Sequence, residues 1–269
     1  MNTALKEKSD KLRALLAGMD GCVIGFSSGV DSTLLFAVAA ELLGERALAV
    51  TATSQTYPER ELNEARELAD RIGGRHIVIV SEELDIPEFR DNPRNRCYYC
   101  KKELFGKLRV IAEREGLQFV LDGTNVDDAG DHRPGRTAAA EIGVRSPLEE
   151  AGFTKQDIRD LSRAMGLPTW DKPAFACLSS RFPYGTAITT ARVGQVGLAE
   201  ESLRSLGFRT LRVRYHGSVA RIELGEGEFE LAAGIHRNDV IRMVKEAGFT
   251  YVALDLQGYR TGAMNEEEP

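Results

Sequence analysis

Short apolar strands alternate with helices through the first two thirds of the chain, and this alternation constrains the fold more than any other feature. The pattern predicts strands at residues 21–26, 47–52, 76–80 and 119–122, with helices at 31–43, 58–72 and 100–115 between them. Strands separated by helices of about ten to fifteen residues pair in parallel through right-handed crossovers. We therefore expect an α/β fold with a parallel sheet, preceded by an amphipathic helix within residues 1–20.

The pattern changes after about residue 170. A polar and aromatic loop with two prolines is followed by a helix at 191–206, strands at 210–215 and 219–224, a helix at 238–247 and a strand at 251–254. The two adjacent strands alternate with period two around His216-Gly217, which is typical of a hairpin. This predicts four parts: an α/β domain at 1–170, an active-site loop carrying Cys177 at 171–190, a smaller α+β domain at 191–262, and a disordered acidic tail at 263–269.

Charge and composition exclude several classes of protein. Lys and Arg number 35 against 41 Asp and Glu, giving a net charge of −6, whereas general nucleic-acid binders are usually basic. No apolar run approaches the roughly 20 residues that span a bilayer. The charged first helix is also unlike a signal peptide. We expect a cytoplasmic protein with no membrane segment, and four cysteines are too few for a disulfide scaffold in 269 residues.

The strongest local motif is the 26–32 loop, Phe-Ser-Ser-Gly-Val-Asp-Ser, between the first strand and its helix. Short residues let the backbone curl around an anion, and a helix N-terminus adds unpaired N–H groups and partial positive charge. The ending of a Walker A loop is absent. The alternative is an ordinary capped helix start, with Asp31 or Ser32 as the cap.

This loop resembles the pyrophosphate loop of the PP-loop ATP pyrophosphatases, whose usual form is Ser-Gly-Gly-x-Asp-Ser; here Ser28 replaces the first glycine. The resemblance implies that ATP adenylates an oxygen of an acceptor and pyrophosphate leaves, with Mg²⁺ held near Asp31. It also implies nucleotide contacts at the loop and at the ends of the second and fourth strands, namely Ser27, Ser28, Gly29, Val30, Asp31, Ser32, Thr51, Thr53, Gly123 and Thr124.

The cysteines suggest which nucleophile follows adenylation. Cys97 and Cys100 form a Cys-x-x-Cys just before a predicted helix, a spacing shared by half zinc sites, redox pairs and cluster ligands. Cys177 lies in the long loop, where it is either functional or a buried inert thiol. Cys22 lies within the apolar first strand, and we expect it to be inert.

Several longer motifs resemble the LarE-type ATP-dependent sulfur transferases, which act in nickel-pincer nucleotide biosynthesis. The resemblance covers residues 10–260 and is carried by Asp127-Asp128, Arg133-Pro134-Gly135, Arg145-Ser146-Pro147-Leu148, Trp170-Asp171-Lys172-Pro173 and the segment around Cys177. It implies a small nucleotide substrate, pyridinium-3,5-biscarboxylic acid mononucleotide, whose carboxylates become thiocarboxylates. It also implies a homo-oligomer, for which a hexamer is one candidate.

The resemblance leaves two sources of sulfur open. Members with one cysteine donate its own sulfur and keep dehydroalanine, whereas members with three hold a [4Fe–4S] cluster that binds an extra sulfide. This chain has Cys97, Cys100 and Cys177 and so matches the three-cysteine form. Three thiolates would leave one iron open, as a reactive cluster requires. The alternative is a sacrificial Cys177 with the Cys-x-x-Cys as a bystander.

The acceptor carries a phosphate and carboxylates, so its pocket should be basic. Arg212 and Arg214 lie two apart on a predicted strand and share a face, which suits a phosphate. A solvated strand face rich in Arg is the alternative. Arg181 is a second candidate for anion contact and catalysis, with Ser180 and Glu223 as weaker candidates.

Three rival functions share some of these features. A PP-loop tRNA thiolase can carry three cysteines, but the negative charge and lack of a basic tail oppose it. An ammonia-using adenylating synthetase would leave the three cysteines without a role. A non-catalytic nucleotide sensor with a degenerate loop would not release pyrophosphate from ATP when an acceptor is present.

Overall fold

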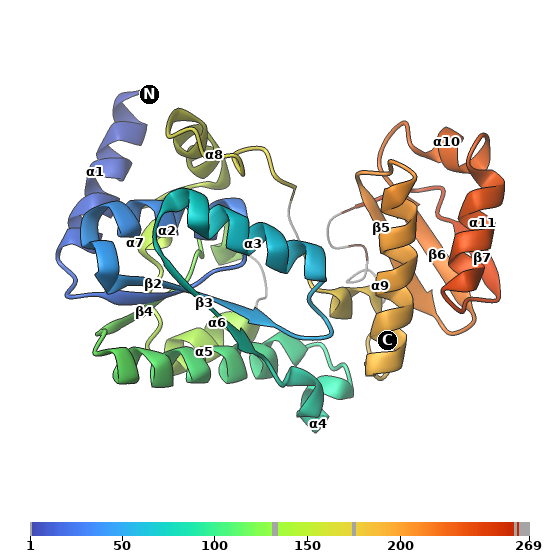
Figure 1. Ribbon diagram of the computed structural model, residues 1–269, viewed down its shortest axis with the longest axis horizontal. Helices are drawn as coiled ribbons and strands as arrows, with labels where there is room; N and C mark the ends of the chain where they lie inside the picture. Colours follow the sequence, from blue (N-terminus) through green and yellow to red (C-terminus); the bar gives the residue numbers. More distant parts are fainter. Residues whose placement is uncertain (1, 131–133, 174–175, 261–262, 264–269) are drawn as a thin grey trace. The chain divides into compact units, whose positions relative to one another are not determined.

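A computed structural model describes residues 2–130, 134–173, 176–260 and 263, and the chain forms two compact units (Figure 1). The first comprises Met1–Glu83 and Asn95–Phe175, and the second Leu84–Arg94 and Ala176–Pro269. The segment 84–94 thus joins the second unit, although the sequence analysis assigned it to the first domain. Arg133 of the Arg-Pro-Gly motif and the tail from residue 264 onward lie outside the described residues.

A parallel sheet forms the centre of the first unit. Its strands are β1 (Cys22–Gly25), β2 (Ala47–Thr53), β3 (Arg75–Val80) and β4 (Phe119–Leu121), in the order β3-β2-β1-β4. All three strand pairs are parallel. The predicted parallel α/β fold is therefore confirmed, and the carboxyl ends of the strands share one edge.

Helices cover both faces of this sheet, as parallel sheets require. On one face lie α1 (Thr3–Ala17), α2 (Val30–Leu43), α3 (Glu59–Ile72), α7 (Pro147–Glu150) and α8 (Lys155–Ala164), whose apolar side chains form one buried cluster with the sheet. The other face packs against α5 (Arg96–Glu115) and α6 (Pro134–Ile142).

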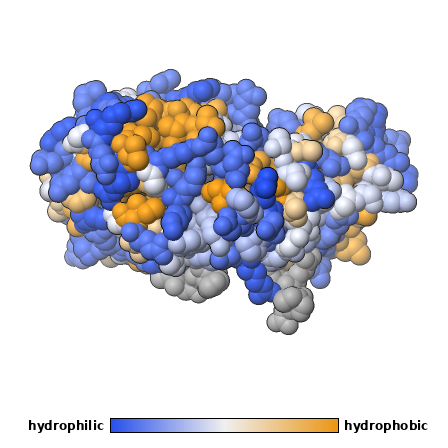
Figure 2. Space-filling view, turned by 90° about the horizontal axis from the view of Figure 1, so that it is seen from below, coloured by the Kyte–Doolittle hydropathy of each residue, from blue (hydrophilic) through white to orange (hydrophobic). Residues whose placement is uncertain are grey.

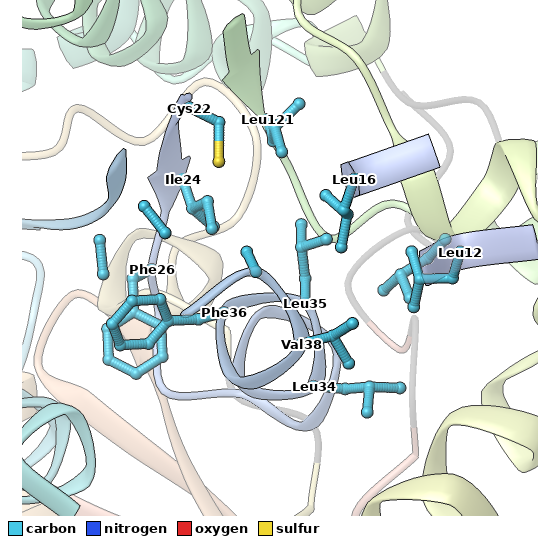
Figure 3. Close-up of a cluster of buried hydrophobic side chains, with 14 of the residues drawn as sticks. Leu12, Leu16, Cys22, Ile24, Phe26, Leu34, Leu35, Phe36, Val38 and Leu121 are labelled. Atoms are coloured by element: carbon cyan, nitrogen blue, oxygen red, sulfur yellow. The ribbon is translucent and has the colours of Figure 1, made fainter. Parts of the chain in front are cut away.

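Strand β1 shows how the two faces share the core. Cys22 and Ile24 belong to the cluster around α2, whereas Val23 belongs to the cluster around α5, because successive strand residues point to opposite faces. Figure 3 shows Cys22 and Ile24 among the side chains of α1 and α2. Cys22 is buried, and burial raises the pKa of its thiol to about 12, so it remains protonated; that it is inert stays a prediction.

Two predictions about helices are wrong. The helix expected from Cys100 begins at Arg96, so both cysteines of the Cys-x-x-Cys lie inside its first turns. The sequence analysis also placed no helix between residues 122 and 170, where the structure has α6, α7 and α8. Helix α8 starts with a capping box in which Thr154 and Asp157 satisfy each other's backbone N–H groups.

The second unit is a small mixed sheet with helices. Strands β5 (Leu211–His216) and β6 (Val219–Leu224) form the predicted antiparallel hairpin, and β7 (Tyr251–Leu254) pairs in parallel with β6. The turn residue Gly217 has φ 65°, a conformation that favours glycine. Helices α9 (Thr190–Ser205) and α11 (Arg237–Glu246) pack on the sheet, with α10 (Phe229–Ala233) between β6 and α11.

The segment 84–94, which includes α4 (Pro87–Arg90), is tied to this second unit by hydrogen bonds. The Asn92 amide donates to the carbonyls of Phe182 and Pro183 at 3.3 and 2.8 Å. The backbone N–H of Ile188 donates to the carbonyl of Arg90 at 2.8 Å. The residues in these contacts lie about ninety positions apart in the sequence, so local sequence patterns do not reveal the contacts.

No helix among the described residues is long and apolar enough to cross a membrane. One face of the molecule shows separate hydrophobic patches within a mainly hydrophilic surface (Figure 2).

Phe36 on α2 tests how much the first unit depends on the packing of α2 against the sheet. Its ring is fully buried and lies 5.3 Å from the ring of Phe26, centroid to centroid. Phe36→Ala should lower the free energy of unfolding by about 3–5 kcal/mol, because it removes a large buried side chain and leaves a cavity. Val110→Ala, at a position 64% exposed, should change it by less than about 0.5 kcal/mol in the same denaturant titration. Equal losses in the two variants would contradict this account of the core.

Candidate functional site

The 26–32 loop leaves the end of β1 and enters α2 with open backbone donors. Gly29 is the residue before the helix, and no side chain caps the helix at that position. The capped start considered above, with Asp31 or Ser32 as the cap, is therefore not the arrangement in the structure. The Ser27 and Ser32 hydroxyls lie 3.2 Å apart across the loop. An uncapped helix N-terminus flanked by hydroxyls is a suitable site for a phosphate group.

Ser28 occupies the strained position of the loop. It has φ 54°, is fully buried, and donates from Oγ to the carbonyl of Ser27 at 2.6 Å. This is the left-handed region that favours glycine, which explains why the usual PP-loop pattern has glycine at this position. Ser28 thus adopts a glycine-like backbone conformation although it carries a side chain.

The ends of β2 and β4 support the loop. Thr51 is buried and its hydroxyl donates to the Phe26 carbonyl at 2.8 Å, so it fixes the loop's first residue. At the end of β4, a Cβ on Gly123 would lie 3.0 Å from the backbone N of Ser32 and 3.1 Å from Cβ of Asp31. Glycine suits this close approach, because a side chain here would press on the backbone of α2, and the approach places Thr124 and Asn125 beside α2.

The other predicted contacts at these strand ends have their own partners. Thr124 donates from Oγ1 to Oδ2 of Asp122 at 2.8 Å. The same carboxylate accepts a hydrogen bond of 2.7 Å from Ser146 Oγ, so the Arg-Ser-Pro-Leu motif helps to fix this turn. The carbonyl of Thr53, at the end of β2, accepts from the backbone N–H of Ser81 at 2.8 Å. Whether these residues touch nucleotide stays a prediction.

Asp31, the predicted Mg²⁺ ligand, lies in the first turn of α2 and has two partners. Its Oδ1 accepts from the Asn125 amide at 3.3 Å, and its Oδ2 accepts from Lys155 Nζ at 2.5 Å. Mg²⁺ usually binds one or two carboxylates together with substrate phosphates. The carboxylate of Asp31, which lies beside a loop suited to phosphate, therefore fits the ion. The sequence analysis did not identify Lys155.

Lys172, from the Trp-Asp-Lys-Pro motif, lies on the other side of the loop. Its ammonium contacts the Ser28 carbonyl at 3.3 Å and two carboxylates of α3, Glu61 at 2.9 Å and Glu64 at 2.8 Å. Glu61 is buried, so the ion pair is shielded from solvent on one side. Lys172 therefore links the loop, α3 and the segment that follows α8.

Cys97 and Cys100 lie in the first turns of α5. Cys97 is exposed and Cys100 half-buried, and their spacing places both on one side of the helix. Gly135 of α6 packs against this turn, where an added Cβ would lie 2.9 Å from Cγ of Lys101 and 3.5 Å from the Cys97 carbonyl oxygen. The pair can supply two thiolates, and the third predicted cluster ligand, Cys177, belongs to the second unit. Among the described residues there is no group of three or more His, Cys, Asp or Glu side chains that could hold a metal.

Within the second unit, Arg181 anchors the segment of Cys177. Arg181 is fully buried and pairs with Glu200 through two parallel hydrogen bonds of 2.9 and 3.0 Å. Its Nη1 also donates to the Cys177 carbonyl at 3.0 Å and to Ser180 Oγ at 2.9 Å. The predicted anion contact of Arg181 is untested, and in the structure its donors hold the backbone on which Cys177 sits.

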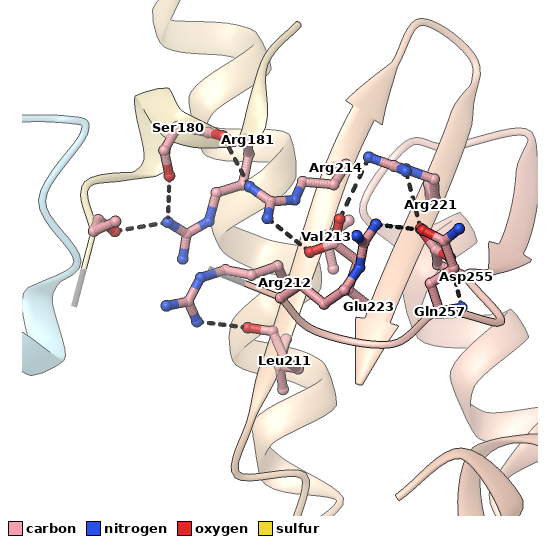
Figure 4. A network of polar contacts seen from close by, with 12 residues as sticks. Ser180, Arg181, Leu211, Arg212, Val213, Arg214, Arg221, Glu223, Asp255 and Gln257 are labelled. Carbon is pink, nitrogen blue, oxygen red and sulfur yellow. Dashed lines mark hydrogen bonds and ion pairs between the residues drawn. The ribbon is translucent and has the colours of Figure 1, made fainter. Parts of the chain in front are cut away.

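The predicted phosphate pair, Arg212 and Arg214, lies close to Arg181 (Figure 4). Arg214 pairs with buried Glu223 at 2.7 Å and donates to the Ser180 carbonyl at 2.9 Å. Arg212 stacks on Tyr259, with its guanidinium carbon 4.8 Å from the ring centre. Burial and the neighbouring Arg181 charge lower the pKa of Arg212 from its usual value.

This arginine cluster differs from the solvated strand face considered as the alternative, because both strand arginines are buried. Arg181 has Glu200 as its ion-pair partner and Arg214 has Glu223. Glu223 is shared with Arg221, which also pairs with Asp255. Guanidinium groups thus gather next to the residues that hold Cys177, which suits the binding of an anion.

Comparison with known proteins gives one family and several relatives. Residues 21–123 match the family described as asparagine synthase. The chain is 43% identical over 262 residues to an uncharacterized protein of Synechocystis, covering 97% of this chain and 98% of that protein. It is 40% identical over 266 residues to the pyridinium-3,5-bisthiocarboxylic acid mononucleotide synthase of Lactiplantibacillus plantarum, covering 97% and 95%. An uncharacterized protein of Methanocaldococcus jannaschii is 29% identical over 240 residues, covering 89% and 90%.

Substitutions at Ser28 test the strain in the loop. Ser28→Gly should keep the free energy of unfolding within about 1 kcal/mol, because relief of the positive φ offsets the greater freedom of the unfolded chain. Ser28→Val should cost about 1–3 kcal/mol, since a β-branched residue is strained at φ 54°. Denaturant titration of both variants checks this. A valine variant as stable as the glycine variant would contradict it.

Glu200 tests the anchor of the Cys177 segment. Glu200→Ala should lower the free energy of unfolding of the second unit by about 3–5 kcal/mol at neutral pH, because Arg181 is left buried without its partner. Glu246→Ala is the matched control, since it removes one carboxylate from an ion pair whose side chains are 53% and 61% exposed. It should cost less than about 0.5 kcal/mol. A similar loss in both variants would contradict the anchoring role.

The same pair predicts a dependence on pH. Burial would raise the pKa of Glu200, but the charge and hydrogen bonds of Arg181 outweigh burial and lower it. The stabilisation is therefore present above the unfolded-state pKa of about 4.3 and is lost as pH falls through the lower folded-state pKa. Unfolding measured across acidic pH should show a shallower slope for Glu200→Ala than for the wild type.

Proposed function

Because the chain belongs to the LarE-type ATP-dependent sulfur transferases, we propose that it converts carboxylates of pyridinium-3,5-biscarboxylic acid mononucleotide into thiocarboxylates for the nickel-pincer cofactor of lactate racemase. The chain is an enzyme of the PP-loop ATP pyrophosphatase type. The observation that carries the proposal is the 40% identity, over 97% of this chain, to a synthase of the bisthiocarboxylic acid mononucleotide.

The first step is adenylation of an acceptor carboxylate. The carboxylate oxygen attacks the α-phosphorus of ATP, the bond to the β-phosphate breaks, and pyrophosphate leaves. The open N-terminus of α2 and the hydroxyls of Ser27 and Ser32 support this role, because they can bind the phosphates of the nucleotide and of the leaving group. When bound, Mg²⁺ would neutralise phosphate charge, and Asp31 is the residue that would hold it.

The second step replaces AMP by sulfur. In the sacrificial form, the Cys177 thiolate attacks the acyl-adenylate, a thioester forms and AMP leaves. Loss of the Cα proton of Cys177 then breaks its Cβ–S bond, which leaves dehydroalanine in the chain and releases the thiocarboxylate. This sequence balances without an oxidant or reductant. Arg181 supports it by holding the Cys177 carbonyl and so positioning the thiol.

The alternative source of sulfur is a [4Fe–4S] cluster, which would supply a bound sulfide as the nucleophile and would be held by Cys97, Cys100 and Cys177. The donor chemistry of the exposed and half-buried pair on α5 suits two of these ligands. In both versions Cys177 is required, whereas only the cluster version requires Cys97. The buried cluster of Arg181, Arg212 and Arg214 supports binding of the acceptor's phosphate next to the Cys177 segment.

Cysteine variants separate these versions. Anaerobically prepared protein would be mixed with ATP, Mg²⁺ and the biscarboxylic acid nucleotide, with pyrophosphate and thiocarboxylate measured separately. Cys177→Ala should release pyrophosphate but form no thiocarboxylate, because adenylation does not need the thiol. Cys97→Ala should lose transfer only if a cluster delivers the sulfur. Cys22→Ala, which removes an inert thiol, is the control and should retain transfer.

The mass of the wild-type chain after one turnover adds an independent readout. Loss of the elements of H₂S from Cys177 would identify sacrificial transfer, and an unchanged mass after transfer would identify an external sulfide. Thiocarboxylate formed at the wild-type rate by Cys177→Ala would contradict both proposed sources of the sulfur.

A further inference from the structure

Lys155 neutralises the carboxylate that is expected to hold the metal. Its ammonium lies 2.5 Å from Oδ2 of Asp31, and the two side chains are 37% and 21% exposed. An ammonium and a Mg²⁺ ion cannot both occupy the same carboxylate oxygen. Binding of the ion through Oδ2 therefore requires Lys155 to leave.

The backbone of Lys155 is fixed while its side chain can move. The N–H of Lys155 donates to Asp127 Oδ2 at 2.7 Å, and the N–H of Asp127 donates to Asn125 Oδ1 at 3.0 Å. Asn125 in turn contacts Asp31. The start of α8 is thus tied to the turn beside Asp31, whereas the four-carbon stem of a lysine is flexible and this one is partly exposed.

A positive charge displaced from Asp31 has a nearby destination. The 26–32 loop runs into α2, the helix that carries Asp31, so a triphosphate bound at the loop would place several negative oxygens beside Asp31. Lys172, on the other side of the loop, already has two carboxylate partners in Glu61 and Glu64. Among the described residues, Lys155 has one carboxylate within ion-pair distance, and that carboxylate is the one the metal would take.

We propose that Lys155 occupies the metal position on Asp31 in the empty enzyme and moves to the phosphates of ATP when Mg²⁺ arrives. The exchange keeps each charge partnered in both states. Before ATP binds, Asp31 has a counter-ion, and afterwards Lys155 stabilises the negative charge that develops on the pyrophosphate as it leaves. This inference rests on the proposed function, because it assumes that ATP·Mg²⁺ binds at this loop.

The exchange predicts opposite effects of Lys155→Met on two binding constants. Without its competitor, Asp31 should bind Mn²⁺ alone more tightly, by about two- to fivefold, which corresponds to the strength of a partly exposed ion pair. The Mg²⁺ complex of α,β-methylene-ATP should bind at least about tenfold more weakly, because a charge-assisted hydrogen bond to phosphate is lost. Mn²⁺ suits the same oxygen ligands and can be followed by electron paramagnetic resonance.

Lys8→Met is the matched control. Lys8 pairs at 2.6 Å with Asp157 of the same helix α8, and its pair has similar exposure, 30% and 23%. This variant loses one lysine and one ion pair at α8 without touching Asp31. Both of its binding constants should stay within about twofold of the wild type, since surface ion pairs act locally.

The outcomes separate this inference from the function on which it rests. Opposite shifts in Lys155→Met, with neither in Lys8→Met, support the exchange. Shifts in the same direction, or no shift, in a protein whose wild type binds the nucleotide complex would overturn the exchange and leave the proposed function standing. A wild type that binds no α,β-methylene-ATP at any Mg²⁺ concentration would overturn both.

Discussion

The uncapped N-terminus of α2 is the constraint on which the rest of the first unit depends. A helix that begins at the carboxyl end of a central parallel strand must leave its first N–H groups facing the sheet edge, and here no side chain caps it at Gly29. The surrounding residues keep this end in place. Thr51 fixes Phe26, Gly123 allows β4 to approach α2 closely, and Ser28 accepts a positive φ that few residues would adopt.

The second unit holds the segment of Cys177 next to a cluster of buried arginines. Arg181 is buried and gives its donors to Glu200 and to the backbone around Cys177, so its role in the structure is to position. Arg214 repeats this pattern with Glu223 and the Ser180 carbonyl. The carboxylates offset part of the cost of burying these guanidiniums.

Much of the fold follows from local sequence patterns, and much of the site does not. The alternation of strands and helices predicts the parallel sheet, and the period-two pattern around His216 predicts the hairpin of the second unit. Helix α8 was missed although its capping box at Thr154 and the glycines on either side, Gly152 and Gly166, were visible in the sequence.

Contacts between distant residues could not be predicted in the same way. The ion pair of Lys155 with Asp31 joins residues 124 apart in sequence, and that of Lys172 with Glu61 joins residues 111 apart. The burial of Arg181 likewise depends on Glu200, which lies on another helix. Motif spacing identified Ser27–Ser32 and Cys177 as candidates because each motif is continuous in sequence, whereas the partners that position them are brought together only by the fold.

Transfer of a carboxylate oxygen to AMP tests the central claim most directly. The biscarboxylic acid nucleotide would be prepared with a heavy oxygen isotope in its carboxylates and incubated with the enzyme, ATP and Mg²⁺ during sulfur transfer. Adenylation of the carboxylate followed by attack of sulfur predicts one labelled oxygen in each AMP and none in pyrophosphate. Unlabelled AMP formed together with thiocarboxylate would contradict the account, because the carboxylate oxygen would then have left by a route that does not pass through an acyl-adenylate.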